Sequence, residues 1–204
     1  TSQAGVLVIV NPNNHDGRLT RRAELIAMAR ARSAEGRWLV VDESFIECAP
    51  GDSVSDLIEP GLIVLHSFGK FYGLAGVRLG FMLAAPDMIQ RLRDLLGDWP
   101  VGADAITMGR GAYAAAEWRS RTSAALDERA GRLDQRLTRA GFQIVGGISL
   151  FRMTRTPHAA RWFQHLCRGG ILTRPFDHTP DALRFGVPTE RDMRRLARAL
   201  EAFS

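Results

Sequence analysis

The chain of 204 residues contains a single lysine among its 27 lysine and arginine residues, and that lysine lies in a glycine-rich segment. Lys70 ends the sequence SFGK at residues 67–70, and FYGLAGVRLG follows at residues 71–80. Arginine can replace lysine as a surface charge, but its protonated, delocalised guanidinium cannot form an imine. We therefore expect amine chemistry at Lys70. The alternative is a surface lysine without a chemical role.

Further polar residues stand where apolar runs end. These runs are typical of strands buried on both faces, and we place them at residues 5–10, 37–42, 62–66 and 79–84. Asn14 follows the first run among turn-forming residues, Asp42 closes the second, and Ser67 and Lys70 follow the third. Because ligand sites of parallel sheets form at the carboxyl ends of strands, we expect these side chains at one edge of a sheet.

The elements that must position these residues alternate along the chain. Helical patterns cover residues 20–33 (with Thr20 as N-cap), 86–96, 103–140 with a break near 116, 158–168, and 189 onward. Later strands are predicted at 142–145 and 150–153, joined by a Gly-Gly turn, and at 171–173 and 183–187. The alternation predicts an α/β fold over residues 1–115, with a mostly parallel sheet and helices on both faces. The short strands paired with helices in residues 116–204 predict a second, smaller α+β domain.

The front of the chain lacks parts that such a domain needs. The sequence enters a buried strand almost at once, without a preceding element to cover it. The loops that carry the polar residues contain no glycine-rich phosphate cradle and no aromatic partner for a flat ligand. We therefore expect that an N-terminal portion of the domain is missing.

Composition narrows the class of protein. The hydrophobic content of 46% and charged content of 24% are ordinary for a soluble globular protein, and no run has the ~20 apolar residues of a membrane span. Because neither cysteine lies in a CxxC pair, we expect a reduced, cytoplasmic setting. Cys48, Cys167 and the five histidines show no metal-ligand spacing, so we expect no metal site. The net charge of +5 is spread over segments that mix arginines with 22 acids, which does not favour nucleic-acid binding.

Four features follow one another along the chain: the turn with Asn14, the strand-closing Asp42, the pair Ser67 and Lys70, and the Gly-x-Arg-x-Gly sequence around Arg78. Together they resemble the fold type I pyridoxal-phosphate (PLP) enzymes, the aminotransferase superfamily, over nearly the whole chain. The resemblance implies PLP as cofactor, which acts as an electron sink. It also implies a homodimer with its active site at the subunit interface.

The resemblance assigns roles to the residues of the first domain. Lys70 would bind the cofactor covalently and move protons at the substrate α-carbon, and Asp42 would pair with the pyridine nitrogen. Asn14 would bind the ring hydroxyl, while Ser67 and Arg78 would hold the cofactor phosphate. The alternative for Asp42 is a helix cap, and the alternative for Arg78 is an ordinary surface arginine.

The resemblance also points to two arginines of the second domain. Arg184, in LRFGV at residues 183–187, matches the arginine that binds the substrate carboxylate. Arg174, in ILTRPF at residues 171–176, is a candidate for a second anion such as a substrate phosphate. A charge between apolar residues of a strand is costly without a partner, and a bound carboxylate would supply one to Arg184.

Within the superfamily, residues 66–81 and 174–188 resemble the histidinol-phosphate aminotransferase branch, and inside it the threonine-phosphate decarboxylases of cobalamin biosynthesis. Phe45 stands where aminotransferases often have a tyrosine, and His15 follows Asn14 where proline is usual. The resemblance thus implies decarboxylation of L-threonine O-phosphate to aminopropanol phosphate and carbon dioxide. The alternatives are an aminotransferase of histidinol-phosphate type and a non-catalytic PLP-fold ligand-binding domain.

Overall fold

The computed structural model describes residues 5–203, and the chain forms two compact units. The first unit comprises the described residues up to Asn14 together with Leu19–Ala116. The second unit comprises His15–Arg18 and the described residues from Glu117 onward. The ranges predicted from the sequence, 1–115 and 116–204, did not separate residues 15–18 from the first unit.

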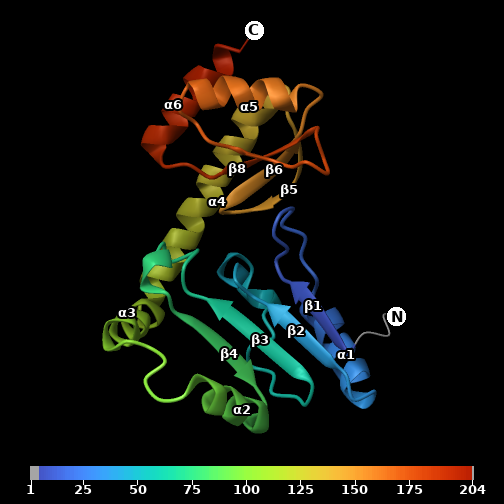
Figure 1. Ribbon diagram of the computed structural model, residues 1–204. Coiled ribbons are helices and arrows are strands. Elements are labelled where there is room, and N and C mark those ends of the chain that lie inside the picture. The colour runs from blue at the N-terminus through green and yellow to red at the C-terminus, as the bar shows by residue number, and fades with distance from the viewer. Residues whose placement is uncertain (1–4, 204) are drawn as a thin grey trace. The chain divides into compact units, whose positions relative to one another are not determined.

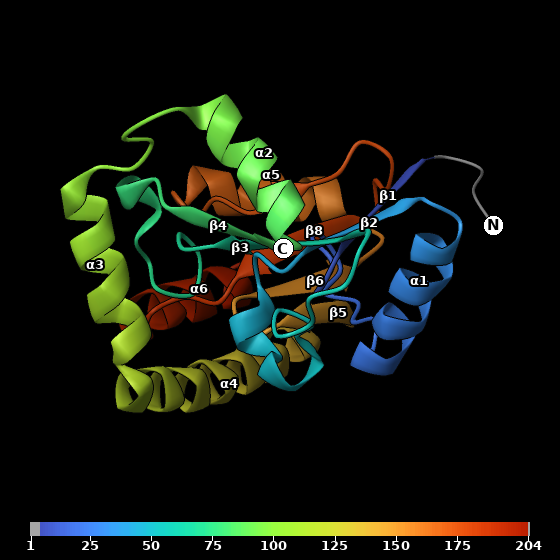
Figure 2. The ribbon, with the colours of Figure 1, turned by 90° about the horizontal axis from the view of Figure 1, so that it is seen from below.

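The first unit is built on a four-stranded sheet in the order β1-β2-β3-β4. Its strands are β1 (Val6–Val10), β2 (Trp38–Asp42), β3 (Leu62–Ser67) and β4 (Gly80–Ala84). The β1–β2 and β2–β3 pairings are parallel, whereas β4 runs antiparallel to β3 (Figure 1). Figure 2 shows α1 (Arg22–Ala34) and α2 (Pro86–Leu96) on opposite sides of this sheet. The predicted α/β class with a mostly parallel sheet is therefore confirmed.

The core of the first unit forms between α1 and the sheet. Leu25 and Ala29 of α1 are buried against a layer of strand side chains; the strand residues are Leu39, Val41, Leu62 and Val64. Each fully buried leucine contributes about 1.5–3 kcal/mol to stability. The alternate residues of β2 and β3 point away from α1, because successive side chains of a strand face opposite sides.

Two sequence predictions in this unit are wrong. The first strand is not buried on both faces: β1 is an edge strand among the described residues, and Val6 and Val8 are 52% and 61% exposed. The first helix begins at Arg22 rather than next to Thr20. The N–H of Thr20 donates to Oδ1 of the buried Asn11 at 2.7 Å, and Nδ2 of Asn11 donates to the carbonyl of Thr20 at 3.1 Å. These two hydrogen bonds hold Thr20 outside the helix.

Helices continue the chain toward the second unit. They are α3 (Ala103–Ala114) and α4 (Ala116–Arg139), and the break at Ala115 agrees with the break predicted near residue 116. The loops of the first unit also contain the short 3-10 helices η1 (Ile46–Cys48), η2 (Pro50–Asp52) and η3 (Ala75–Val77). In the part of the chain that the structure describes, no helix has the length and apolar character needed to cross a bilayer.

The second unit is an antiparallel sheet in the order β5-β6-β8-β7, packed on helices. Its strands are β5 (Gln143–Ile148), β6 (Phe151–Arg155), β7 (Arg174–Pro175) and β8 (Ala182–Gly186). Its core lies between the sheet and the helices α4, α5 (Ala159–Arg168) and α6 (Glu190–Glu201). Leu133, Trp162 and Leu183 are buried there.

Two predicted features of this unit differ in the structure. The pair Gly146-Gly147 lies inside β5 beside a register shift, not in a turn. A Cβ on Gly146 would overlap the carbonyl oxygen of Asp16, so glycine allows residues 15–18 to lie against this strand. Residues 171–173 form no strand, because the N–H of Ile171 instead bonds the carbonyl of Leu166 at the end of α5.

Candidate active site

The sheet of the first unit brings most of the predicted site residues to one edge. Asp42 ends β2 and Ser67 ends β3, and these strands are parallel neighbours. The backbone ladder continues past the strands, since the N–H of Asn11 bonds the carbonyl of Asp42 at 2.8 Å. Asn14 lies three residues further along, exposed in the turn that follows β1.

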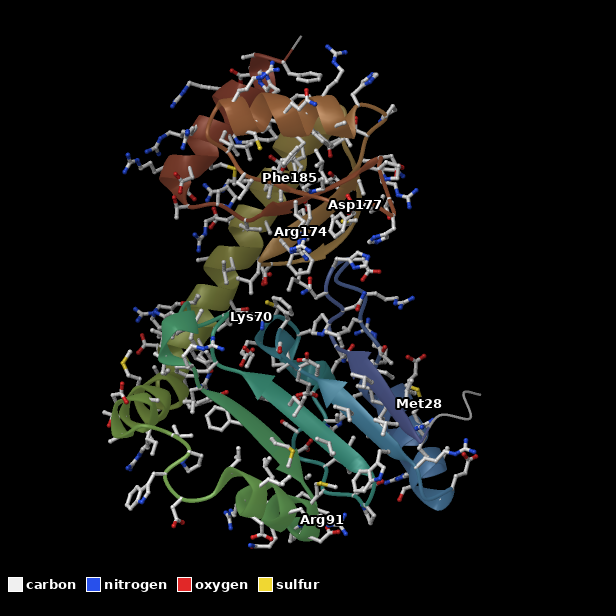
Figure 3. The ribbon with its side chains drawn as sticks, viewed as in Figure 1. Met28, Lys70, Arg91, Arg174, Asp177 and Phe185 are labelled. Carbon is white, nitrogen blue, oxygen red and sulfur yellow. The ribbon has the colours of Figure 1, made fainter. Side chains whose placement is uncertain are left out.

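Lys70 lies beyond the end of β3, at the same edge of the sheet (Figure 3). Its Nζ donates to the Oγ of Ser67 at 3.2 Å and stands 5.2 Å from the ring centroid of Phe45. The lysine side chain itself is exposed. An amine beside a hydroxyl and an aromatic ring, open to solvent, is accessible to a carbonyl ligand.

The loop that carries Lys70 is fixed by buried aromatic rings. Phe68 is fully buried and stacks on Tyr72 with ring centroids 5.1 Å apart, and Tyr113 of α3 contacts both rings. Tyr72 is 8% exposed, so it packs in the core of its own chain. These contacts hold the backbone on both sides of Lys70 while leaving its amine at the surface.

Asp42 is half-buried, and its Oδ1 accepts a hydrogen bond from the N–H of Ser44 at 2.9 Å. The bond spans two residues and closes a turn directly after β2, rather than capping an α-helix. A carboxylate held in this way at the end of a strand can accept a hydrogen bond from a protonated ring nitrogen.

Arg78 lies two residues before β4, the strand that pairs antiparallel with β3. Its backbone adopts the left-handed conformation, with φ 56°, and its Nη1 donates to the carbonyl of Ala75 at 3.2 Å. For a residue other than glycine this conformation costs about 1 kcal/mol, and such strained positions collect at functional sites. The guanidinium is exposed and has a fork geometry suited to an anion with several oxygens.

Sequence reasoning missed a buried network directly behind these residues. Glu43 is fully buried, and its carboxylate accepts from Val54 N at 2.7 Å, from Ser53 Oγ at 2.7 Å and from His66 Nε2 at 2.8 Å. A signal was present, because two acids in a row after a strand must point to opposite sides. Asp42 is half-exposed at the site edge, and Glu43 is turned inward.

The two remaining predicted residues lie in the second unit. Arg174 of β7 stands directly opposite Arg184 of β8 in the antiparallel pairing. The guanidinium of Arg184 lies 4.9 Å from the ring centroid of Phe151. Burial, and then the positive charge of Arg174, lower the pKa of Arg184 from its ordinary value. The structure therefore places two cations side by side, and a bound anion would offset their mutual repulsion.

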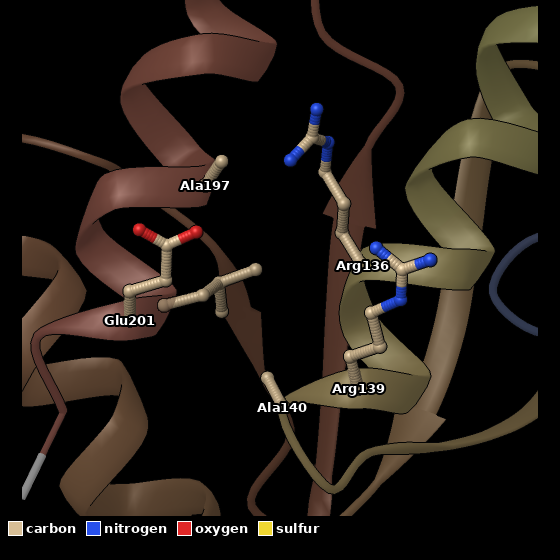
Figure 4. A pocket seen from close by; sticks show the side chains of 6 residues that line it. Arg136, Arg139, Ala140, Ala197 and Glu201 are labelled. Carbon is tan, nitrogen blue, oxygen red and sulfur yellow. The ribbon is translucent and has the colours of Figure 1, made fainter.

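A separate hollow of about 210 Å³ lies between the end of α4 and α6 in the second unit (Figure 4). It is lined by three charged residues, Arg136, Arg139 and Glu201, and by the apolar residues Ala140, Ala197 and Leu200. None of the predicted site residues is among those that line this hollow.

Comparison with known proteins gives relatives over nearly the whole chain. A threonine-phosphate decarboxylase of Sinorhizobium sp is 41% identical over 203 residues, which are 98% of this chain and 60% of that protein. The protein of the same name from Pseudomonas aeruginosa is 40% identical, over 97% of this chain and 60% of its own length. A histidinol-phosphate aminotransferase of Yersinia pseudotuberculosis is 30% identical, over 97% of this chain and 54% of that protein. The chain thus spans about 60% of the length of the curated decarboxylases that it matches.

Solved structures share the fold. The histidinol-phosphate aminotransferase of Clostridium acetobutylicum matches with a TM-score of 0.89 at 18% identity, over 97% of this chain and 63% of that one. The histidinol-phosphate aminotransferase from Sinorhizobium meliloti, in complex with pyridoxal-5'-phosphate, matches with a TM-score of 0.86 at 20% identity. The match covers 98% of this chain and 58% of that one. The family model for aminotransferase class I and II matches residues 1–200. With this match and the shared fold, the chain belongs to the aminotransferase class I and II family.

Proposed function

We propose that the protein is a PLP-dependent decarboxylase that converts L-threonine O-phosphate to aminopropanol phosphate and carbon dioxide. The observation that carries the proposal is the 40–41% identity to two threonine-phosphate decarboxylases, against 30% for a histidinol-phosphate aminotransferase. Family membership supports the cofactor, and the residues at the sheet edge support the site.

The residues of the first unit fit PLP by their chemistry. Lys70 is the only amine side chain in the chain, and it lies beside Ser67 at the edge where Asp42 also ends its strand. Asp42 would hold the proton on the pyridine nitrogen, and Asn14 would bind the ring hydroxyl. Ser67 and Arg78 would bind the cofactor phosphate through hydroxyl and guanidinium donors. When bound, the cofactor withdraws electrons from the substrate α-carbon.

Lys70 has two roles in the proposed reaction. It binds the cofactor through its amine, and after the substrate takes that position its free amine returns a proton to the α-carbon. Phe45, beside the Lys70 amine, carries no hydroxyl that could bond there. In aminotransferases a tyrosine often stands at this position, so Phe45 supports a reaction other than transamination.

The second unit would recognise the substrate. Arg184 would bind the α-carboxylate, and Arg174 would bind the phosphate group. A guanidinium binds a carboxylate through two parallel hydrogen bonds, which fixes orientation as well as affinity. Orientation decides the reaction, because the bond that breaks is the one held perpendicular to the cofactor ring. Both arginines therefore act on which bond breaks as well as on binding.

Two other functions remain as candidates. The 30% identity to a histidinol-phosphate aminotransferase supports transamination of a phosphorylated amine as the second candidate. A non-catalytic ligand-binding domain is less well supported, because the set of Lys70, Asp42 and Arg78 is intact. We also propose that the protein is a homodimer in the cytoplasm, as the family resemblance implies.

Product analysis tests the proposal. The cofactor-loaded protein is incubated with L-threonine O-phosphate, and released carbon dioxide and aminopropanol phosphate are measured. In parallel it is incubated with histidinol phosphate and a keto-acid acceptor. Carbon dioxide from the first substrate supports decarboxylation. Amino-group transfer without carbon dioxide would make the protein an aminotransferase, and turnover of neither substrate would favour a non-catalytic domain.

A further inference from the structure

Four basic side chains of the second unit surround one phenyl ring. The Phe176 ring lies 5.1 Å from the ring of His15 and 5.8 Å from the ring of His178. The guanidinium carbons of Arg174 and Arg184 lie 5.8 and 5.9 Å from its centroid. The two imidazole rings are themselves 5.6 Å apart. We call these five residues the Phe176 cluster.

Three segments of the chain build the Phe176 cluster. The pairing of β7 with β8 puts Arg174 opposite Arg184, and directly opposite residues project from the same face of a sheet. The loop after β7 supplies Phe176 and His178. His15 arrives from residues 15–18, which lie against β5 at Gly146. The convergence therefore depends on packing between segments more than one hundred residues apart.

The cluster gathers positive charge on apolar surfaces. Phe176 and Phe151 contact the guanidinium of Arg184, and cation–π contacts of this kind are favourable. Burial and the neighbouring Arg174 lower the pKa of Arg184, so a bound anion would favour its charged form. Arg174 and His178 are exposed, whereas His15 and Arg184 are half-buried. Like charges held together at a surface in this way favour the binding of a multiply charged anion.

The number of donors indicates which anion fits. One guanidinium saturates the two oxygens of a carboxylate through its fork, which leaves the other arginine and both histidines without a role in carboxylate binding. A phosphate monoester carries close to two negative charges at neutral pH and three acceptor oxygens. Arg174, His15 and His178 are three donor side chains, so each could bond one of the three oxygens.

We infer that His15 and His178, together with Arg174, form the subsite for the phosphate group of a phosphate-monoester substrate. The identification of that substrate as L-threonine O-phosphate rests on the proposed function. His15 would then be a specificity-determining residue in the position where the family usually has proline.

The test measures binding of inorganic phosphate to the cofactor-loaded protein by isothermal titration calorimetry. His15→Phe and His178→Phe keep an aromatic ring against Phe176 but remove the N–H donors. We expect each to weaken phosphate binding about tenfold, the usual effect of losing a hydrogen bond to a charged group. His158→Phe replaces an exposed histidine outside the cluster and should bind phosphate like the wild type. The melting temperature of each variant is measured, and His15→Ala or His178→Ala replaces any variant that does not fold.

The outcomes separate this inference from the proposed function. Unchanged phosphate affinity in both histidine variants overturns the subsite, even if the protein decarboxylates L-threonine O-phosphate. Weaker phosphate binding in both variants, with normal binding in His158→Phe, supports the subsite. That second result would stand even if no carbon dioxide were released, in which case only the proposed reaction would fail.

Discussion

In the first unit, the carboxylate of Glu43 lies 2.8 Å from the ring Nε2 of His66, and the Glu43 side chain is fully buried. Each partner stands beside a proposed site residue, because Asp42 precedes Glu43 and Ser67 follows His66. The same carboxylate also binds the N–H of Val54. The Glu43 carboxylate therefore links the ends of β2 and β3 to the loop at Ser53 and Val54.

Removing that carboxylate should destabilise the protein strongly. We expect Glu43→Ala to lower the free energy of unfolding by about 3 kcal/mol or more, because it leaves several buried donors without an acceptor. Chemical denaturation of the wild type and the variant gives the difference. Glu35→Ala, which removes a half-exposed acid paired with Arg37, is the control and should cost less than about 1 kcal/mol. Equal costs for the two variants would show that the network does not stabilise the fold.

The covalent role of Lys70 gives a direct chemical prediction. Borohydride reduction of the PLP-loaded protein should attach the cofactor to the peptide that contains Lys70, which mass spectrometry can identify. Lys70→Ala and Lys70→Arg should both lose this attachment, since neither side chain can form an imine. Lys70→Arg is the charge-matched control for electrostatic binding of the cofactor. A reduced adduct on this chain in either variant would contradict the assignment.

The carboxylate of Asp42 should matter for turnover and not for folding. Asp42→Asn is nearly isosteric and can still accept the hydrogen bond from Ser44 N. We expect it to lower kcat by about 100-fold, because the neutral amide no longer holds the proton on the pyridine nitrogen. Steady-state kinetics and a thermal melt of the same preparation check both parts. Near-normal turnover would mean that Asp42 serves only to close the turn.

Acid stability should depend on Asp52. The backbone N–H of Arg22, and then the side chain of Arg21, lower the pKa of this carboxyl from its ordinary value near 4. Because the folded-state pKa is the lower one, its contribution is fully present above the unfolded pKa. It is lost as the pH falls through the folded pKa. Asp52→Asn should therefore be less stable than the wild type at neutral pH and lose less stability on acidification. Urea denaturation between about pH 7 and pH 3 measures this, with the exposed Asp98→Asn as control.

Assembly can be tested independently of chemistry. The family resemblance implies a homodimer with its active site at the subunit interface. We therefore expect the cofactor-loaded protein to sediment as a symmetric dimer with one isologous interface. Sedimentation velocity at several concentrations, combined with activity measurements, checks this. A fully active monomer would contradict the shared site.

The sequence determined the elements whose local pattern is strong. The helix at Pro86–Leu96 and the break between α3 and α4 occur where predicted, because proline placement and helical periodicity are local properties. The order of Asn14, Asp42, Lys70 and Arg78 along the chain was likewise readable, since each follows or precedes an apolar run. The parallel pairing of β1, β2 and β3, and the antiparallel return of β4, then account for their common edge.

Tertiary structure determined the burial and the long-range contacts that a local sequence pattern cannot specify. The apolar run at β1 does not reveal that Val8 is exposed, because burial depends on what covers each face of the sheet. Nor does the sequence near His15 indicate that this residue contacts Phe176, some 160 positions away. That contact exists because Gly146 admits the backbone of residues 15–18. The residue types were set by the sequence, whereas the neighbours that give them a chemical environment were set by long-range packing.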